Sequence, residues 1–504
     1  MKTYSDYMKE ITADDLYRGL LVYGLFSDRL PPMFTMDDFW DYDQRKEKAF
    51  EGADHDYVYF EMTKNTGDPR PFGLPTPMAY QRLCEGLKGN WDKLQKHFED
   101  HTSNQEYKIS RIHIRKIKDT EKLFEMNYHK WWIDPEPEQD LLIGKKYIAR
   151  SDISTCFPSI YTHSIPWALI GKEASKKNRK ETEWFNQIDK LCRATKYGET
   201  HGLLIGPHAS NLVAELILTI VDERLSSKYS FVRNIDDYEC FVESYEEGER
   251  FIAELSEALR EFDLPINRKK TEIVPLPLAS VTHWVRKINE AIVLFLDSKE
   301  KISRNDIQAF LDTAVILINE SKDVAVLKYC IKVIYGKKDK LKHDAIEYYI
   351  KTVFHLSFIY PYIMPYLFEL VFSPFKVDIS AIKQYANKLY EDAKRTIRYD
   401  ALYYTLFFAL HYDFEIKSFD YKDAVEKNDC LYKLLTWLYC KKRKISEGSK
   451  ELRNNALTLK KKTTGNLDQY WIFVYEALPT SELPGEWAKM KSDKVSFLKA
   501  GYRP

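Results

Sequence analysis

The sequence predicts an α+β chain in which a split βαβ sheet with helices precedes an all-α, helical-repeat-like C-terminal part. Strand-like and helix-like patterns alternate between about residues 140 and 280, and strand patterns cease after about residue 285. At 504 residues the chain is too long for one compact core. We therefore expect an N-terminal region over residues 1–140, a sheet region over residues 141–284 and a helical domain over residues 285–504.

The composition is that of a globular protein, with 44% hydrophobic and 30% charged residues. Its 76 Lys and Arg balance its 76 Asp and Glu, whereas proteins that grip long duplex nucleic acid usually carry a basic excess. The seven cysteines are scattered without a CxxC pair, which favours a reducing, cytoplasmic location. The most apolar segment, residues 355–375, contains Glu369 and three prolines, so we expect buried helices and no membrane partner.

The sheet region begins with a predicted strand over residues 146–153 that carries Asp152 near its end. Taken alone, an Asp at a strand end is more often a turn or helix cap. A loop with two glycines follows at residues 201–211, before a helix whose apolar residues lie on one face. Taken alone, this is more often a plain loop.

Residues 231–242 predict two short strands around the turn Asp236-Asp237. Aspartate favours turns on its own account, so the pair alone is weak support for a functional site. An amphipathic helix over residues 251–262 and a basic closing strand over residues 264–274 complete the pattern.

The order of these elements places Asp152 and the pair Asp236/Asp237 on adjacent strands, although they lie 84 positions apart. Three crowded carboxylates repel one another unless cations neutralise them. We therefore predict a site for two Mg²⁺ ions, with Mn²⁺ as the alternative. Such ions lower the pKa of an attacking hydroxyl and stabilise a leaving pyrophosphate.

Four motifs of this region resemble the palm motifs of reverse transcriptases. They are Asp152-Ile153-x-x-x-Phe157, Gly202-Leu203-x-x-Gly206-x-x-x-Ser210-Asn211, Ile235-Asp236-Asp237 and Asn267-x-x-Lys270-Thr271. Four segments resemble more narrowly the bacterial abortive-infection (Abi) reverse transcriptases of the AbiK/AbiA-like kind. These are residues 23–35, 156–167, 171–179 and 199–202. The resemblance implies reverse-transcriptase-like fingers and palm ahead of the helical domain.

Chemistry and this resemblance together assign the catalytic roles. Asp152 and Asp236 are expected to hold the metals, with Asp237 close by. Lys270 is the candidate donor of a proton to the departing pyrophosphate, and a solvated surface lysine is the equal alternative.

The resemblance also implies a substrate site for dNTPs. Phe157 would lie under the incoming sugar and exclude a 2′-hydroxyl, while Gly206 and Ser210 would shape the pocket of the base and the primer end. Arg111 is the candidate triphosphate clamp, with a salt-bridged surface arginine as the equal alternative. Reverse transcriptases usually place an aromatic residue two positions before the Asp pair, where this chain has Asn234, which disfavours ordinary handling of template and primer.

The Abi resemblance implies anti-phage defence in the bacterial cytoplasm, by DNA synthesis that copies no template and starts from a tyrosine hydroxyl of the protein. The product would be single-stranded DNA covalently attached to the chain, and the family implies a homo-oligomer, a trimer or hexamer. The sequence does not single out the priming residue among 35 tyrosines.

Two other functions remain open. One is an RNA-templated reverse transcriptase of a related defence or retron-like system, and the other is a scaffold or sensor with a vestigial polymerase site.

His97 and His101, four positions apart on a predicted helix, have the spacing of zinc ligands, but no third ligand accompanies them, so packing is favoured.

Overall fold

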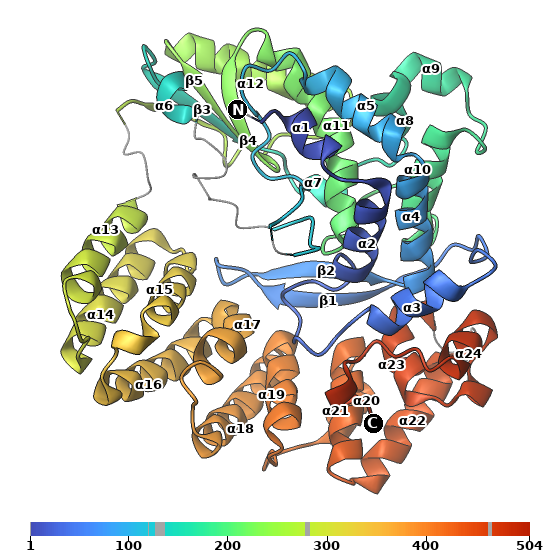
Figure 1. The fold of residues 1–504 in the computed structure, drawn as a ribbon, viewed down its shortest axis with the longest axis vertical. Coiled ribbons are helices and arrows are strands. Elements are labelled where there is room, and N and C mark those ends of the chain that lie inside the picture. The colour runs from blue at the N-terminus through green and yellow to red at the C-terminus, as the bar shows by residue number, and fades with distance from the viewer. Residues whose placement is uncertain (1, 119, 126–136, 278–282, 462–465) are drawn as a thin grey trace. The chain divides into compact units, whose positions relative to one another are not determined.

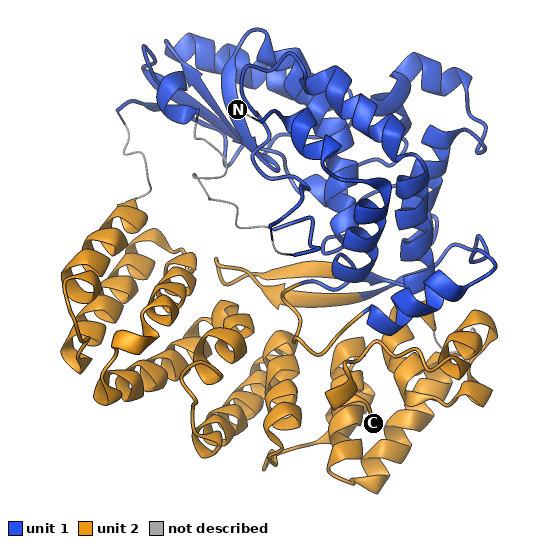
Figure 2. Ribbon diagram, in the orientation of Figure 1, with its two compact units in different colours: residues 1–27, 36–58, 73–278 blue, residues 28–35, 59–72, 279–504 orange. Residues whose placement is uncertain are grey.

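The structure is a computed structural model that describes residues 2–118, 120–125, 137–277, 283–461 and 466–504 (Figure 1). The chain divides into two compact units (Figure 2). Unit 1 contains residues 1–27, 36–58 and 73–278, and unit 2 contains residues 28–35, 59–72 and 279–504.

Unit 1 is rich in short helices. The first two begin at capping boxes, in which Thr3 and Thr12 exchange hydrogen bonds with Asp6 and Asp15. The helices of unit 1 are α1 Tyr4–Lys9, α2 Ala13–Tyr23, α3 Asp37–Arg45, α4 Pro77–Gly89, α5 Trp91–Thr102, α6 Glu138–Leu141, α7 Cys156–Ser159, α8 Ser164–Ile170, α9 Lys172–Lys177, α10 Trp184–Ala194, α11 His208–Ser226 and α12 Tyr245–Arg260.

A four-stranded sheet of unit 1 carries the predicted carboxylates, and we call it the carboxylate sheet. Its strand order is β4-β5-β3-β6, with antiparallel neighbours. The strands are β3 Tyr147–Asp152, β4 Ser230–Asn234, β5 Asp237–Val242 and β6 Glu272–Pro275. The closing strand is therefore shorter than the predicted 264–274, because residues 267–270 form a turn before it.

Apolar residues cover both faces of the carboxylate sheet. Ile148, Val232 and Phe241 form a buried cluster on one face. On the other face the ring of Phe231 lies 5.8 Å from that of Phe251, which belongs to α12. Burial of both faces explains why these short strands read as apolar runs.

Strands β1 Tyr57–Thr63 and β2 Pro69–Pro75 form a separate two-stranded sheet. Residues 59–72 of this sheet belong to unit 2, and polar side chains fix them there. The backbone amide and hydroxyl of Thr63 donate to the Asp400 carboxylate at 3.0 and 2.6 Å. The side chain of Asn65 donates to Asp323 at 2.8 Å.

Unit 2 is an irregular array of helices, as the sequence predicts for its C-terminal part. Helix α14 packs on α15 and α16, α18 on α19, and α19 on α21. Its helices are α13 His283–Ala291, α14 Arg304–Ser321, α15 Ala325–Gly336, α16 His343–Ile359, α17 Met364–Leu367, α18 Ile379–Thr396, α19 Tyr399–Tyr412, α20 Tyr421–Glu426, α21 Cys430–Lys442, α22 Ser446–Leu459, α23 Trp471–Ala477 and α24 Gly485–Ser492. The α+β fold class with a helical C-terminal part is confirmed.

The apolar segment 355–375 is broken into short pieces. Helix α16 ends at Ile359, just before Pro361, and α17 spans only Met364–Leu367. Across the described ranges, no helix combines the length and apolar character needed to span a bilayer.

The pair His97 and His101 joins α5 to α11. His97 Nε2 lies 2.9 Å from the Leu216 carbonyl oxygen, and His101 Nδ1 lies 2.6 Å from Glu223 Oε2. Burial, assisted by the His101 charge, lowers the pKa of His97 to about 4. The interpretation of His97 as a packing histidine accords with these contacts.

Because the pKa of His97 is lowered by folding, its stabilisation is complete above the unfolded value and is lost as the pH falls toward 4. We expect the α5–α11 contact to lose up to about 3 kcal/mol of opening free energy between pH 7 and pH 4. Hydrogen exchange of the α5 amides at both pH values measures this loss. His97→Gln keeps a donor for Leu216 and should flatten the pH dependence, whereas the exposed-residue control His283→Gln should not. An equally steep dependence in His97→Gln would refute the assignment.

Candidate active site

Two of the three predicted carboxylates lie opposite each other on neighbouring strands. Asp152, the last residue of β3, is paired in register with Asp237, the first residue of β5. Asp236 occupies the turn before β5, and its carbonyl oxygen accepts a hydrogen bond from the Ile153 amide at 3.1 Å. The sheet therefore gathers the three aspartates at one end, as the sequence predicts.

The turn that presents Asp236 has an unusual backbone. Asn234 pairs with Asp237, so Ile235 and Asp236 alone connect β4 to β5. Ile235 has φ +60°, in the left-handed region that β-branched residues rarely adopt. Such a conformation persists only where its surroundings impose it. Here Arg233 Nη1 donates to the Ile235 carbonyl at 2.9 Å.

Arg233 is fully buried and forms two ion pairs with α11. Its Nη1 lies 2.7 Å from Glu215 Oε1, and its Nη2 lies 2.7 Å from Asp222 Oδ2. Its Nε also lies 2.9 Å from the same Asp222 oxygen. The planar guanidinium thus binds two carboxylates and a turn carbonyl at once, which a lysine ammonium cannot do in this geometry.

Two further side chains complete the buried network around Glu215. The Tyr4 hydroxyl donates to Glu215 Oε2 at 2.9 Å, and the Ser110 hydroxyl donates to the same oxygen at 3.0 Å. The network therefore ties α1, the segment around Ser110, α11 and β4 together behind the Asp236 turn.

This network was not predicted from the sequence, although the sequence carries a signal of it. Glu215 and Asp222 are seven positions apart, so they share one face of an otherwise apolar helix. Arg233 lies in the apolar strand that leads to the Asp pair. Buried charges of opposite sign on neighbouring elements indicate an ion pair.

The carboxylates repel one another. Burial raises the pKa of Asp236 to about 6, and the charges of Asp237 and Asp152 add to this effect. The loss of surrounding water and the Asp152 charge raise the pKa of Asp237 as well. Excess negative charge at this end of the sheet therefore favours a bound cation.

Lys270 supplies a positive charge at the same place. It lies in the turn before β6 and not in a strand, and its ammonium pairs with Asp152 Oδ2. The hydrogen bond that Lys270 donates to Asp152 is the main cause that raises the pKa of Lys270. Asn267 in the same turn donates its backbone amide to the Asp152 carbonyl at 2.7 Å, which fixes the turn against β3.

The donor set fits Mg²⁺. Mg²⁺ takes oxygen ligands and is usually held by one or two carboxylates, with water and substrate phosphates completing its shell. Asp152 and Asp236 provide such carboxylates. In the part of the chain that the structure describes, no three Asp, Glu, His or Cys side chains form a complete cage for an ion. The remaining ligands would therefore come from substrate and water.

Of the residues predicted to bind dNTP, the structure places Phe157 next to the glycine loop that contains Gly206. The Phe157 carbonyl in α7 accepts from the Leu203 amide at 2.8 Å, so the glycine loop docks on α7. A side chain at Gly202 would come within 2.9 Å of the Pro158 carbonyl oxygen, and its φ is +83°. Gly206 closes the loop, and Ser210 lies buried in the first turn of α11.

Arg111 lies beside β4. Its backbone amide donates to the Arg233 carbonyl at 2.8 Å. Its side chain points toward Glu138, with Nε 3.9 Å from Oε1, and Nη1 donates to the Lys108 carbonyl at 3.4 Å. These contacts match the salt-bridged alternative. A role as triphosphate clamp remains a prediction and would require the guanidinium to leave Glu138.

Comparison with known proteins identifies the domain that carries these residues. Residues 63–282 match the family model described as reverse transcriptase (RNA-dependent DNA polymerase). No curated protein matches the chain. Among solved structures, telomerase from Candida albicans in complex with the TWJ fragment of telomeric RNA is similar, with 13% identity, coverage of 60% of each chain and a TM-score of 0.28.

The family match supports a reverse-transcriptase-type domain over the carboxylate sheet, which indicates a nucleotidyltransferase of the polymerase class. The helical part after residue 282 lies outside the matched residues.

Replacing Arg233 by Ala should leave Glu215 and Asp222 buried and unpaired. We expect a loss of about 3–5 kcal/mol in unfolding free energy, because an isolated buried charge is costly. Urea denaturation measures this loss. The matched control is Arg224→Ala on α11, the helix of Glu215 and Asp222, which breaks a half-exposed pair with Glu261 and should cost less than about 1 kcal/mol. Equal stability of the two variants would contradict the role assigned to the network.

Proposed function

We propose that this protein is a reverse-transcriptase-like DNA polymerase of anti-phage abortive infection. It adds dNTPs without a template, starting from a tyrosine hydroxyl of a protein. The observation that carries the polymerase assignment is the convergence of Asp152, Asp236 and Asp237 at one end of the sheet.

In the proposed mechanism, Asp152 and Asp236 would hold two Mg²⁺ ions, with Asp237 beside them. When bound, these ions would lower the pKa of the attacking hydroxyl and stabilise the charge on pyrophosphate. Lys270 moves from Asp152 to the departing pyrophosphate and donates a proton to its oxygen. The hydrogen bond to Asp152 raises the pKa of Lys270 and keeps the ammonium protonated before the step, and leaving Asp152 removes this main cause, so that the proton becomes easier to donate.

Phe157 and the glycine loop would bind the incoming nucleotide. The aromatic ring leaves no room for a 2′-hydroxyl, which selects dNTPs over rNTPs. Gly206 and Ser210 shape the base and primer-end pocket. The hydrogen bond from the Leu203 amide to the Phe157 carbonyl supports this assignment, because it places the glycine loop beside α7.

Three observations favour synthesis without a template. Asn234 replaces the aromatic residue that usually handles primer or template in reverse transcriptases, and in the structure it is half-buried in register with Asp237. The formal net charge is zero, without a basic excess for a long duplex. An irregular array of helices follows the domain, which agrees with the resemblance to Abi enzymes.

A second candidate is an RNA-templated reverse transcriptase of a related defence or retron-like system. The observation that favours it is the description of the matching family as RNA-dependent DNA polymerase. The two candidates share the carboxylate chemistry. They differ in what serves as the primer and in whether a template determines the sequence of the product.

A synthesis assay separates the two candidates. Purified protein with Mg²⁺ and labelled dNTPs, but no template or primer, should yield label that runs with the protein on a denaturing gel and is released as DNA by protease. Asp236→Ala should abolish this label, because the site loses a metal ligand, while the exposed Asp312→Ala should retain it.

Activity that appears only with an RNA template and annealed primer would overturn the template-free proposal and support the second candidate. Labelling that persists in Asp236→Ala would overturn the assignment of the carboxylate site.

A further inference from the structure

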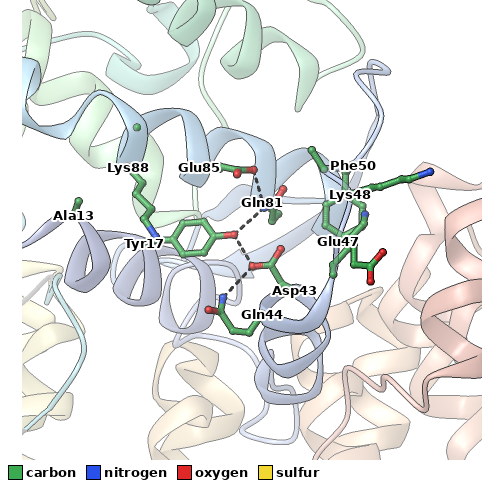
Figure 3. A pocket seen from close by; sticks show the side chains of 13 residues that line it. Ala13, Tyr17, Asp43, Gln44, Glu47, Lys48, Phe50, Gln81, Glu85 and Lys88 are labelled. Atoms are coloured by element: carbon green, nitrogen blue, oxygen red, sulfur yellow. Dashed lines mark hydrogen bonds between the residues drawn. The ribbon is translucent and has the colours of Figure 1, made fainter.

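A second site lies in unit 1, away from the strands of the carboxylate sheet. Helices α2, α3 and α4, together with the segment 46–50, enclose a cavity of about 530 Å³ (Figure 3). This volume is in the range of small-ligand sites and is large enough for a nucleotide. None of its lining residues belongs to the predicted polymerase machinery.

The floor of this α2–α4 pocket is a chain of hydrogen bonds. Gln81 Nε2 donates to the Tyr17 hydroxyl at 2.7 Å and to Glu85 Oε2 at 3.0 Å. The Tyr17 hydroxyl donates to Asp43 Oδ2 at 2.7 Å. In Figure 3 these side chains lie side by side in the middle of the pocket.

One floor atom lacks a partner. Gln81 is 4% exposed, and its Oε1 oxygen accepts no hydrogen bond within the described residues. Both amino hydrogens of Gln81 are engaged, so the amide orientation is fixed by its neighbours. A buried acceptor of this kind is costly unless a ligand or water donates to it. Together with the carboxylates of Asp43 and Glu85, it makes the floor rich in acceptors.

The rim adds positive charge. Lys46, Lys48 and Lys88 line the pocket together with Glu47, and in Figure 3 Lys48 and Lys88 lie at its two ends. The Lys88 ammonium pairs with Asp14 at 2.7 Å. The ammonium of Lys46 covers the ring of Phe50, 2.9 Å from its centroid. The Phe50 ring is buried, so it holds the Lys46 ammonium and does not offer a free face to a ligand. A charge-assisted hydrogen bond to phosphate is stronger than a cation–π contact, so a phosphate at the rim could draw the Lys46 ammonium toward it.

These features define the chemistry of the ligand. A purely anionic ligand would be repelled by the carboxylates of the floor, whereas Lys46 and Lys48 favour a ligand that also carries an anion. A ligand that combines adjacent hydrogen-bond donors with an anion therefore suits both parts of the pocket. Guanine presents two adjacent donors on one edge, N1–H and the 2-amino group, whereas adenine and cytosine each present a single amino group on that edge.

We propose that the α2–α4 pocket binds a guanine nucleotide. The guanine N1–H and 2-amino groups donate to Gln81 Oε1 and to the carboxylates of Asp43 and Glu85. The phosphates contact Lys46 and Lys48. The nucleotide is either free or the terminal residue of a DNA strand, and the site lies outside the polymerase reaction proposed above.

Equilibrium dialysis of the full chain with GTP in EDTA tests this proposal. EDTA removes divalent ions from the carboxylate sheet, so binding there does not interfere, and a failure here leaves the polymerase proposal standing. We expect saturable binding of GTP, and at least about tenfold weaker binding of ITP, which lacks the 2-amino group, and of ATP. A 5′-guanine oligodeoxynucleotide that competes with GTP would identify a strand end as the source, and one that does not compete would identify the free nucleotide.

Two variants test the residues. Gln81→Leu and the double variant Lys46→Ala/Lys48→Ala should each weaken GTP binding at least about tenfold. The double variant changes only rim residues, so it reports on binding even if Gln81→Leu fails to fold. The matched control is Lys93→Ala, an exposed lysine on α5 that should leave binding unchanged. The absence of saturable GTP binding up to about 1 mM, a preference for ATP, or unchanged binding in both variants would overturn the proposal.

Discussion

The position of the Asp236 turn depends on one buried guanidinium. Arg233 binds Glu215 and Asp222 on α11 and, at the same time, the carbonyl of Ile235. A buried ion pair seldom adds much net stability, because desolvation offsets the attraction, but the loss of one partner is costly. We interpret the network as a device that imposes one turn geometry, since the left-handed Ile235 would otherwise relax. The buried Arg233 network thereby fixes the position of the Asp236 turn at the end of the carboxylate sheet.

At this end of the sheet, the three carboxylates concentrate negative charge. Burial and the Asp152 charge raise the pKa values of Asp236 and Asp237, and the Lys270 ammonium, which pairs with Asp152, offsets only part of this negative charge. A site with more negative charge than its own cations can neutralise is suited to bind metal with a polyphosphate. Lys270 lies in the turn before β6, from which its ammonium reaches Asp152. Its transfer to a leaving group is part of the proposed function. The balanced charges of the Arg233 network and the unbalanced charges of the three aspartates are thus parts of one arrangement.

Much of this arrangement could be predicted from the sequence. The strands with Asp152 and with the Asp pair, the helix after the glycine loop and the helical C-terminal part follow from apolar periodicity, which is a local signal. Arg233 and its partners were missed because their pairing depends on how α11 packs against β4. The turn at Lys270 was predicted as strand because its residues 267–270 precede β6 without a glycine or proline break. The membership of residues 59–72 in unit 2 rests on Thr63 and Asn65, whose partners lie hundreds of positions away.

Anomalous diffraction from crystals grown with Mn²⁺ and a non-hydrolysable α,β-imido dNTP tests whether the three aspartates form a metal site for nucleotide binding. We expect two Mn²⁺ peaks at the end of the carboxylate sheet, ligated by Asp152 and Asp236 and by the triphosphate. We also expect the Lys270 ammonium to leave Asp152 for the phosphates. A triphosphate bound without Mn²⁺ at these carboxylates, or Mn²⁺ bound only elsewhere, would contradict this assignment.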